Sequence, residues 1–528
     1  MTNQEKTTMT KGITRRTFLT TTVAGGFSVV SPFNSHNSFA KGESANFDDI
    51  RNKIKKAVQG NSPASIAVAV SKDGKIIWEE AFGWANRERR IPATINTRYA
   101  LSSASKPFTA TAIMTLVERS LIKLDEPISK YLGSMRLTAY AGDASSVTVR
   151  HLLQHTSGLP RHWRNFYADE NEFAPKLQET IQRYGILTSV PGKQYNYSNL
   201  GYALLAHIIE QVSGLAFAEF MRKEVFLPLG LSDTTIENDQ RLSRPAAVFY
   251  GGGGTVEPYY TVDESGSQRV FSTARDLIKF GMFHLKERPP GQKQIIKPSA
   301  IDRMARERQT MREADGADFF SALGWVGREK SAYSYYNLGH SGDAPGVSAQ
   351  LMILPDERIA IATVSNTRFA ELIYTVADDV LDALLPDNQK MRESDPTAKP
   401  EAAAPPFKPT EELLGRWTGE IKTYSGTVPA AMTFQPDGDV HLKLEGQLET
   451  LVNNLRFESG RIIGRCQGTI TTEDAMRRPH QLRLVLLQQG GVLSGTVHAQ
   501  SSIDSQAKSS PRRDYFALAS WIELTKRA

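Results

Sequence analysis

The sequence predicts an α+β protein in which a mixed body of strands and helices is followed by an all-β module. Residues 47–385 switch between strand-like and helix-like apolar patterns, whereas residues after 410 show only two-residue alternation. A proline-rich stretch, 386–410, separates the two patterns and is typical of a partly extended linker. We therefore divide the chain into a leader (1–40), a mixed α+β body (41–385), a linker (386–410) and a β-barrel-like module (411–528).

The body opens with a predicted strand pair and continues with predicted helices. Ser65 to Val70 and Ile76 to Phe82 flank the turn Lys72-Asp73-Gly74. A helix is predicted over Phe108 to Ile122, because apolar residues recur there at helical spacing, and a second over Tyr202 to Val212.

The module after the linker shows hairpin signals. Met432 and Phe434 alternate with polar residues before the turn Pro436-Asp437-Gly438, and alternation resumes after it. Strand patterns follow at Leu482 to Leu487, Val492 to Val497 and Tyr515 to Leu524. The length suffices for about eight short strands. Three roles stay open for the module: ligand binding, coverage of the active site, and stabilisation of the body.

Composition excludes several classes of protein. The 528 residues are 40% hydrophobic and 23% charged, which is typical of a soluble globular protein and excludes disordered, fibrous and multi-spanning membrane chains. The single cysteine, Cys466, excludes an internal disulfide framework and cysteine-cluster metal sites, and packing is its simplest role.

The N-terminus has the three parts of an export signal. Basic residues are followed by the apolar run Phe18 to Val30 and by the small-residue site Ser38-Phe39-Ala40. Thr14 to Leu19 resembles the bacterial twin-arginine signal, which implies a periplasmic or otherwise exported protein. A disordered arm is the alternative. The leader carries four basic residues and one acidic residue, so the net charge falls from +6 to +3 without it. That leaves no electrostatic case for nucleic acid, and no membrane span is expected in the mature chain.

The first candidate catalytic motif is Ser103-Ala104-Ser105-Lys106, at the start of a predicted helix. Serine and lysine three positions apart share one helix face, so a desolvated amine can take the proton of the hydroxyl. The helix N-terminus would stabilise the resulting oxyanion. The alternative is a helix-capping serine followed by a solvated lysine.

The second motif, Tyr197-Ser198-Asn199, lies in a loop before an apolar helix. The tyrosine could carry a proton to a leaving group, and the asparagine could hold the lysine amine or a substrate carbonyl. The alternative is a packing aromatic beside an asparagine helix cap.

The third motif is His340-Ser341-Gly342, followed by Asp343. A glycine on a strand edge would let substrate lie along the backbone, and the Asp343 N–H could join that of Ser103 as an oxyanion donor. The alternative for His340 is an ordinary loop histidine.

Together, in this order, the motifs resemble those of the serine β-lactamase and penicillin-binding-protein superfamily. The segments His151 to Leu159 and Ser272 to Leu277 look like those of its class C-like branch. The resemblance covers about 50–385. It implies an antiparallel sheet flanked by helices, an all-helical subdomain and an active site between them. It also implies an acyl-enzyme on Ser103, with Lys106 and Tyr197 sharing the acid and base roles. His340 stands where β-lactamases of this branch carry lysine, a departure frequent among its esterases and peptidases.

The remaining motifs indicate no cofactor or metal site. His151 and His155 have helical zinc-ligand spacing, but Leu152 replaces the glutamate that such a hydrolase needs. The glycine run 251–254 lacks the Lys-Ser or Lys-Thr of a phosphate loop and is better interpreted as a flexible loop. Arg161, His162 and Trp163 could line a cleft or form an exposed loop.

Two function classes follow from the sequence. The leading hypothesis is an exported serine hydrolase that cleaves an ester, an amide or D-amino-acid peptide, or a β-lactam through Ser103. Asn199, His340, Gly342 and Asp343 are its candidate substrate-binding residues. The alternative is a non-catalytic, penicillin-binding-like sensor or cell-wall-binding protein. The partner in the first case is a small-molecule or peptide substrate, and the oligomeric state stays open.

Overall fold

The computed structural model describes residues 46–60, 63–237, 246–251, 254–312, 318–331, 334–368, 371–395, 407–458, 460–501 and 515–526. The predicted signal, 1–40, and residues 252–253 of the glycine run lie outside the described residues. All elements below belong to one compact unit that begins at Asn46.

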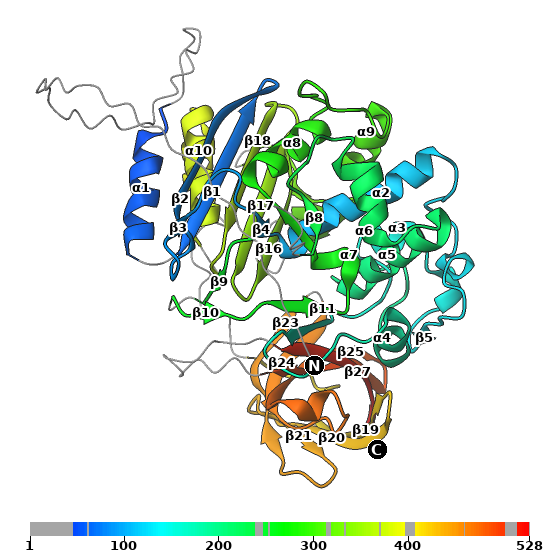
Figure 1. The fold of residues 1–528 in the computed structure, drawn as a ribbon. Coiled ribbons are helices and arrows are strands. Elements are labelled where there is room, and N and C mark those ends of the chain that lie inside the picture. Colours follow the sequence, from blue (N-terminus) through cyan, green and yellow to red (C-terminus); the bar gives the residue numbers. More distant parts are fainter. Residues whose placement is uncertain are drawn as a thin grey trace, which may run out of the picture. The chain divides into compact units, whose positions relative to one another are not determined.

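An antiparallel sheet forms the centre of the body (Figure 1). Its strands run in the order β13-β14-β15-β16-β17-β18-β1-β2-β3. The predicted strand pair is confirmed as β1 and β2, with Asp73 and Gly74 of the turn both at positive φ. The strands are β1 (Ser65–Lys72), β2 (Lys75–Asn86), β3 (Ile91–Pro92), β13 (Gln309–Arg312), β14 (Asp318–Ser321), β15 (Val326–Arg328), β16 (Asn337–Ala344), β17 (Val347–Leu354) and β18 (Ile359–Ser365).

Helices cover both faces of this sheet, which is why every residue of β18 is buried. On one face, the Thr363 hydroxyl donates to the carbonyl of Ile373 in α10 (Leu372–Leu384). On the other, Gly281 of α8 (Ala274–His284) lies directly on Ala360. Residues 360 and 363 point to opposite faces of the strand, so the two helices sandwich it. Helix α1 (Asp48–Gln59) packs against β2 and α10.

A helical subdomain stands beside the sheet, built around α2 (Lys106–Glu118) and α5 (Asn199–Ser213) (Figure 1). Both predicted helices are confirmed with shifted ends. Helix α2 ends at Glu118, before the predicted end at Ile122, and Ser120 just after it has a φ of 60°. The other helical elements are η1 (Ser102–Ser105), η2 (Ile128–Lys130), η3 (Ala144–Ser146), α3 (Val149–Leu153), α4 (Leu177–Tyr184), α6 (Phe217–Phe220), η4 (Met221–Phe226), α7 (Ser265–Gln268) and α9 (Pro298–Arg306).

Short strands complete the body. Three of them, β4, β12 and β8, form a small sheet beside the turn η1. Their bounds, with those of the remaining pairs, are β4 (Tyr99–Ala100), β5 (Thr138–Ala139), β7 (Ile186–Leu187), β8 (Thr235–Ile236), β9 (Phe249–Tyr250), β10 (Val256–Glu257) and β12 (Val270–Ser272).

The C-terminal strands curve into a barrel-like sheet in the order β22-β21-β20-β19-β27-β26-β25-β24-β23 (Figure 1). Two strands of the body join it: β6 (Trp163–Tyr167) pairs with β27, and β11 (Tyr260–Val262) pairs with β6. The all-β prediction is confirmed, but the shared sheet was not foreseen. The strands are β19 (Gly415–Thr423), β20 (Gly426–Phe434), β21 (Val440–Leu444), β22 (Thr450–Leu451), β23 (Asn453–Glu458), β24 (Arg461–Gln467), β25 (His480–Gln489), β26 (Val492–Ser501) and β27 (Phe516–Lys526), with the helical turn η5 (Ala475–Arg477).

Single residues explain the interior of this barrel. Trp417 is fully buried, and its indole N–H donates to the carbonyl of Leu413 at 2.8 Å. Cys466 is buried as well, and burial raises the pKa of its thiol to about 11. Such a thiol is unreactive, so the packing role that the sequence favours is confirmed.

One part of the predicted linker is helical rather than extended. Residues Asn388–Ser394 form a helix, α11, in a stretch that lacks proline. Gln389 bonds Glu393 one turn later, and Arg392 pairs with Asp382 of α10. These local contacts stabilise a helix that ends before Pro396.

In the described part of the chain, no single helix has both the length and the apolar character needed to cross a membrane. Asn199–Ser213 and Phe217–Phe226 meet those criteria only as a pair, bent by 77°.

Candidate active site

Ser103 lies in the tight turn η1, which leads directly into α2. The residue before it, Ser102, has a φ of 46°, a conformation that costs a non-glycine residue free energy and is found at functional sites. The Ser102 hydroxyl lies 3.4 Å from Gln268 Oε1 and 3.3 Å from the carbonyl oxygen of Asp343. Because neither η1 nor α2 has a side-chain cap, the helix-cap alternative is wrong.

Lys106 is fully buried, so it is not the solvated lysine of that alternative. Its Nζ lies 3.1 Å from Ser103 Oγ and 2.9 Å from Asn199 Oδ1. Burial lowers the pKa of Lys106 well below its usual value, against the opposing charge of Glu264. A buried amine with a depressed pKa can act as a base toward the serine hydroxyl.

Tyr197 contacts the same serine from the other side. Its hydroxyl donates to Ser103 Oγ at 2.8 Å, and Lys106 Nζ lies 4.7 Å from the centre of its ring. Burial raises the pKa of Tyr197 to about 12. The phenol is therefore protonated at neutral pH, in keeping with the hydrogen bond it donates to Ser103 Oγ.

Asn199 holds the lysine. The amide oxygen accepts from Lys106, and the amide nitrogen donates to the carbonyl of His162 at 2.8 Å. The structure shows Asn199 holding Lys106, one of the two roles open from the sequence, and binding of a substrate carbonyl stays a prediction. The cap of α5 is Ser198, whose hydroxyl accepts from the N–H of Gly201.

His155 supports Tyr197, a contact that the sequence did not reveal. The two rings stack with centres 4.4 Å apart, and His155 Nδ1 accepts from the N–H of Ser198. Burial holds the pKa of His155 well below its usual range, so the ring is neutral. His151, its partner in the discarded zinc pattern, instead accepts the N–H of Thr148 in a capping box at α3.

Behind Lys106 lies a buried acidic pair, Asp263 and Glu264. Burial, and then the charge of Asp263, raise the pKa of Glu264 well above its usual value. Ligand atoms of His162, Asp263 and Glu264 lie within 4.8 Å of one another, a spacing that could hold a cation. Asp263 Oδ2 is already bonded to His162 Nε2 and to the hydroxyl of Thr180, so we assign the cluster no metal.

His340 lies on β16 with its ring centre 6.4 Å from that of Tyr197. Burial, and then the charge of Lys106, lower the pKa of His340 to about 3, so the imidazole is neutral. Its Nδ1 lies 2.8 Å from the carbonyl oxygen of Ser341 and must carry the proton there. The buried Nε2 is left as an acceptor without a protein partner in the described residues.

Gly342 makes room for the turn η1, and the expectation that substrate lies along this strand stays a prediction. A Cβ at this position would lie 2.0 Å from the carbonyl oxygen of Leu101 and 2.9 Å from the N–H nitrogen of Ser103. The carboxylate of Asp343 accepts from Ser348 and Tyr374. Its side chain is thereby engaged within the fold.

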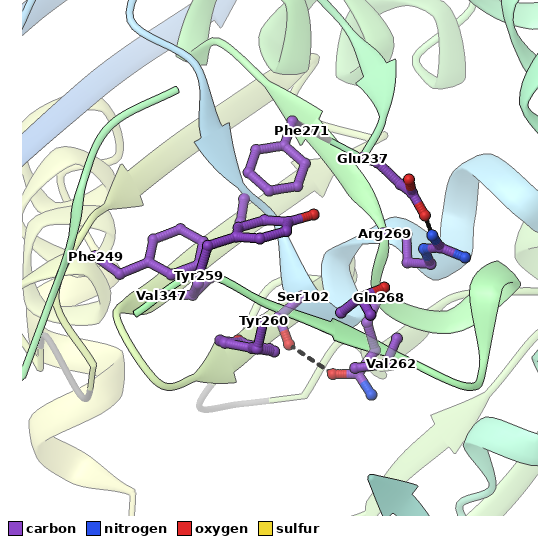
Figure 2. A pocket seen from close by; sticks show the side chains of 12 residues that line it. Ser102, Glu237, Phe249, Tyr259, Tyr260, Val262, Gln268, Arg269, Phe271 and Val347 are labelled. Atoms are coloured by element: carbon purple, nitrogen blue, oxygen red, sulfur yellow. Dashed lines mark hydrogen bonds and ion pairs between the residues drawn. The ribbon is translucent and has the colours of Figure 1, made fainter. Parts of the chain in front are cut away.

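A hollow lies next to Ser102 and holds about 370 Å³ of empty space, open solvent included (Figure 2). Aromatic rings of Phe249, Tyr259, Tyr260 and Phe271 line it, and Gln268 and Arg269 lie at its polar end. Arg269 is ion-paired with Glu237. The hollow could take an apolar substituent of a substrate bound at the neighbouring serine.

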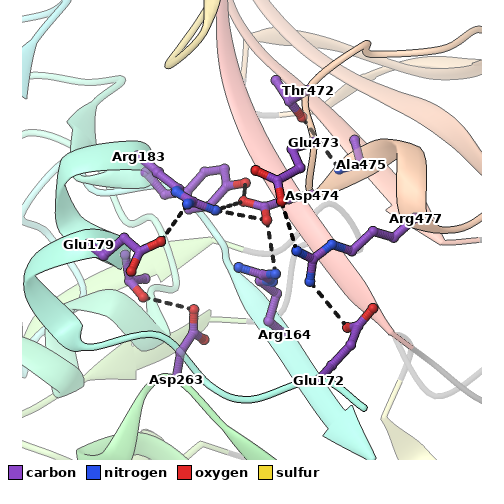
Figure 3. Close-up of polar contacts among 12 residues, drawn as sticks. Arg164, Glu172, Glu179, Arg183, Asp263, Thr472, Glu473, Asp474, Ala475 and Arg477 are labelled. Atoms are coloured by element: carbon purple, nitrogen blue, oxygen red, sulfur yellow. Dashed lines mark hydrogen bonds and ion pairs between the residues drawn. The ribbon is translucent and has the colours of Figure 1, made fainter. Parts of the chain in front are cut away.

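The barrel touches the loops that carry the site. At the centre of this junction, Asp474 accepts from Arg164 at 3.0 Å, from Arg183 at 2.8 Å and from the Tyr184 hydroxyl at 2.6 Å (Figure 3). Burial alone would raise the pKa of Asp474, but these partners hold it below its usual range.

A second contact reaches the tyrosine loop. Arg461 at the start of β24 donates to Asn196, the neighbour of Tyr197, at 3.0 Å, and also to Gln194. The β6–β27 pairing meanwhile fixes Trp163, which follows the loop residues Arg161 and His162. Of these two residues His162 is buried and Arg161 exposed, so the segment is neither wholly cleft nor wholly surface.

An antiparallel sheet beside a helical subdomain, with a Ser-Lys-Tyr group where β16 meets η1, defines the class of serine β-lactamases and penicillin-binding proteins. A family model described as Beta-lactamase matches residues 50–382. The chain belongs to this β-lactamase family.

Two relatives show the extent of the similarity. Penicillin-binding protein 4* of Bacillus subtilis (strain 168) is 28% identical over 409 residues, 72% of this chain and 84% of that protein. Protein flp of Staphylococcus aureus (strain MW2) is 23% identical over 313 residues, and the match spans 60% of its length.

Solved structures share the fold at lower identity. SurE aligns with a TM-score of 0.60 at 21% identity over 86% of this chain and 98% of its own. The octameric penicillin-binding protein homologue from Pyrococcus abyssi aligns with a TM-score of 0.54 at 20% identity, over 90% of this chain and 100% of its own. A class C β-lactamase aligns with a TM-score of 0.54 at 18% identity, over 64% of this chain and 95% of its own.

Proposed function

We propose that this chain is an exported serine hydrolase that cleaves its substrate in two steps through an acyl-enzyme on Ser103. One observation carries the proposal: Lys106 Nζ and Tyr197 Oη both lie within hydrogen-bond distance of Ser103 Oγ. One group can remove the proton while the other returns it.

In the acylation step, Ser103 Oγ attacks the substrate carbonyl carbon and gives its proton to the neutral Lys106 amine. Negative charge then develops on the carbonyl oxygen. The backbone N–H groups of Ser103 and Asp343 are the donors we assign to that oxygen. Collapse of the tetrahedral intermediate breaks the bond to the leaving group, which takes a proton from Tyr197 while Lys106 reprotonates the phenol.

In the deacylation step, a water molecule attacks the acyl carbonyl. Its proton passes to the Tyr197 and Lys106 pair, and Ser103 Oγ leaves and is reprotonated. Neutral His340 offers an unpartnered acceptor, Nε2, beside Tyr197, and we assign it to a donor group of the substrate or to this water.

The side chain at position 340 bears on the proposed substrate class. A lysine at position 340 would present a cation to the substrate, whereas His340 with a pKa of about 3 presents none. We therefore place esters and D-amino-acid peptides ahead of β-lactams. The solved structures of the same fold include EstCE1, described as a hydrolase with promiscuous acyltransferase activity, SurE with D-Leu, and class C β-lactamases.

A three-substrate panel tests the proposal. A short-chain p-nitrophenyl ester, a D-amino-acid peptide and nitrocefin are incubated with the same preparation and with its Ser103→Ala variant. We expect turnover of the ester or the peptide that Ser103→Ala abolishes. Turnover that survives Ser103→Ala excludes the mechanism. Absence of turnover on all three, with stoichiometric labelling of Ser103, favours the sensor hypothesis instead.

Export is proposed from residues 1–40, which have the three parts of an export signal. Fractionation of a native host that carries the full-length gene, with an Arg15→Lys, Arg16→Lys variant as control, tests it. We expect the wild-type protein outside the cytoplasm and the variant retained inside.

A further inference from the structure

Two buried carboxyl groups lie close together behind the catalytic lysine, and no step of the proposed reaction uses them. Asp263 and Glu264 follow directly after β11, and an oxygen of each lies within 4.8 Å of the other. The side chain of Asp263 and the whole of Glu264 are 0% exposed. Two like charges this close in a buried site repel each other strongly, so the pair favours a state with a single negative charge.

Hydrogen bonds place that charge on Asp263. One oxygen of each carboxyl, Asp263 Oδ1 and Glu264 Oε1, has no partner in the described part of the chain, so the other oxygens make the difference. Asp263 Oδ2 lies 3.3 Å from His162 Nε2 and accepts from the Thr180 hydroxyl at 3.0 Å (Figure 3). Glu264 Oε2 accepts from the Gln268 side chain at a longer 3.4 Å. An ionised carboxylate needs donors when it is buried, so Glu264 is the group that keeps the proton.

The pKa of Glu264 agrees with this placement. Burial, and then the charge of Asp263, raise it well above its usual value. The backbone N–H groups of Glu264 and Arg164 and the charge of Lys106 act in the opposite direction, without outweighing burial. Glu264 is therefore a neutral carboxylic acid at neutral pH.

The short helix α7 joins the pair to the lysine. Lys106 Nζ lies 3.3 Å from the carbonyl oxygen of Ser267. The N–H and the hydroxyl of Ser267 both donate to the carbonyl of Glu264, at 3.2 and 3.0 Å. Gly266 lies so close to α5 that a Cβ would be 2.1 Å from the carbonyl oxygen of Tyr202. These contacts fix the position of Glu264, and it is the acid whose charge acts on Lys106.

The other ionisable groups that face Lys106 supply no negative charge at neutral pH. Four buried rings around it are neutral, because burial lowers the pKa of the histidines and raises that of the tyrosines: His155, His340, Tyr197 and Tyr202. Arg161, in the loop before β6, is positive and lowers the pKa of Lys106, whereas an ionised Glu264 raises it. The protonation state of Glu264 therefore decides how readily Lys106 gives up its own proton.

We propose that Asp263 and Glu264 are positioning residues that share one proton: Asp263 carries the charge, Glu264 keeps the proton, and Lys106 is thereby left as a neutral amine. Such an amine is ready to accept the proton of Ser103. The inference rests on the proposed hydrolase function and adds to it two residues that act through Lys106. His162, which holds Asp263, stands directly before β6, the strand that the body shares with the barrel.

The pH dependence of Ser103 labelling by a fluorophosphonate tests the pair. In Asp263→Asn the repelling charge is gone, so Glu264 ionises at lower pH and raises the pKa of Lys106. At a fixed pH below the wild-type midpoint, we expect the labelling rate, relative to its plateau, to fall by about tenfold. In Glu264→Gln the side chain stays neutral, so the midpoint should not rise.

The double variant Asp263→Asn, Glu264→Gln separates this effect from a general loss of structure. With no acid left to ionise beside Lys106, the upward shift seen in Asp263→Asn should disappear. A midpoint does not depend on how much of the preparation is folded. Asp276→Asn is the control: it removes a buried carboxyl of α8 that pairs with Lys279, and it should leave the midpoint unchanged.

Thr180→Val is a milder probe if Asp263→Asn fails to fold. It removes one donor to Asp263 Oδ2, so the charge moves partly to Glu264 and the midpoint should rise by less than in Asp263→Asn. Thr363→Val removes a buried hydroxyl that donates to α10 and should not shift the midpoint.

Infrared spectroscopy detects the shared proton directly. A protonated carboxyl absorbs at a higher frequency than a carboxylate, and we expect this band at neutral pH to be weaker in Glu264→Gln than in wild type. Equal bands, equal midpoints in wild type and both Asp263→Asn and Thr180→Val, or a shift that persists in the double variant would each overturn the shared proton and leave the hydrolase proposal standing. Absence of any Ser103 labelling in wild type overturns the hydrolase proposal itself.

Discussion

At the scale of single residues, the site depends on close approach of backbone and on burial of charge. Gly342 lets β16 approach the nucleophile turn to a distance that no side chain would allow. Burial lowers the pKa of Lys106 and raises that of Tyr197. At the same serine, the lysine therefore gives up its proton more easily than usual and the phenol less easily. Both effects come from desolvation, so they depend on packing rather than on any single hydrogen bond.

Gly342→Ala tests the close approach. Its Cβ would meet the carbonyl oxygen of Leu101, so the turn or the strand must shift. We expect acylation to slow by about 10²-fold or more, as when an oxyanion donor is displaced. We also expect a loss of roughly 1–3 kcal/mol of stability from overpacking. Gly491→Ala, where a Cβ meets nothing within 4 Å, is the control and should match wild type in both assays. Equal acylation rates for the two variants would contradict the account.

The pH dependence tests the protonation states. kcat/KM should rise with pH as Lys106 loses its proton, at a midpoint below 10.5, and fall only near 12 as Tyr197 ionises. His340, with a pKa of about 3, should contribute no step near pH 6.5. His340→Asn should therefore leave the acid limb where it is, whatever its effect on rate. A limb near 6.5 that disappears in His340→Asn would show a titrating imidazole. The apparent values belong to the coupled Lys106 and Tyr197 pair.

At the scale of elements, much of the body could be predicted because its signals are local. The β1–β2 turn, the α2 and α5 periodicities and the barrel hairpin are each contained in a short window of sequence. The ends of elements were less predictable: Ser198 caps α5, where the alternative interpretation of the motif had Asn199, and α11 forms in the linker.

Contacts between distant segments could not be predicted from local patterns. His155 reaches Tyr197 across 42 positions, and Arg461 reaches Asn196 across 265. The three motifs suggested which residues meet, but their spacing carries no information on the stacking partner, the acid behind Lys106 or the shared β6–β27 edge. These features arise from tertiary packing, which a single sequence does not display.

Asp474→Asn tests the junction element. The carboxylate is fully buried between Arg164 and Arg183, so removing its charge leaves both cations short of a partner. We expect a loss of about 3–5 kcal/mol in unfolding free energy at neutral pH. Because the folded pKa of Asp474 is depressed, its contribution is present above pH 3.8 and is lost as pH falls through the folded value. The variant and wild type should therefore converge in acid.

Glu473→Gln is the control for that experiment. Its side chain is 71% exposed and, among the described residues, pairs only with Arg477 one turn away. Exposed pairs of this kind contribute little, so the free energy of unfolding should change by less than about 1 kcal/mol. If the Asp474 and Glu473 variants melt alike, the buried ion cluster is not what holds the barrel to the body.

At the scale of the whole molecule, the barrel and the body form one structural unit from Asn46 onward. They share a sheet through β6 and β27, the Asp474 cluster and a stacked pair, Tyr140 and Trp521, with ring centres 5.5 Å apart. The barrel thereby reaches two loops of the site, at Trp163 and at Asn196. Of the three roles left open from the sequence, stabilisation of the body is the one these contacts favour.

Calorimetry tests this unity. We expect a single cooperative transition, with calorimetric and van't Hoff enthalpies in agreement, because neither part can leave without breaking the shared edge. Asp474→Asn should broaden the transition or divide it in two. Two well-separated transitions in the wild type would mean that the barrel is only tethered, and its role in the site would have to be abandoned.

The most direct test of the central claim is the mass of the protein after reaction with a fluorophosphonate. We predict one covalent adduct per chain, mapped by peptide sequencing to Ser103, formed more slowly in Lys106→Ala and absent from Ser103→Ala. An adduct on another residue, or one that survives Ser103→Ala, would contradict the assignment of Ser103 as the nucleophile.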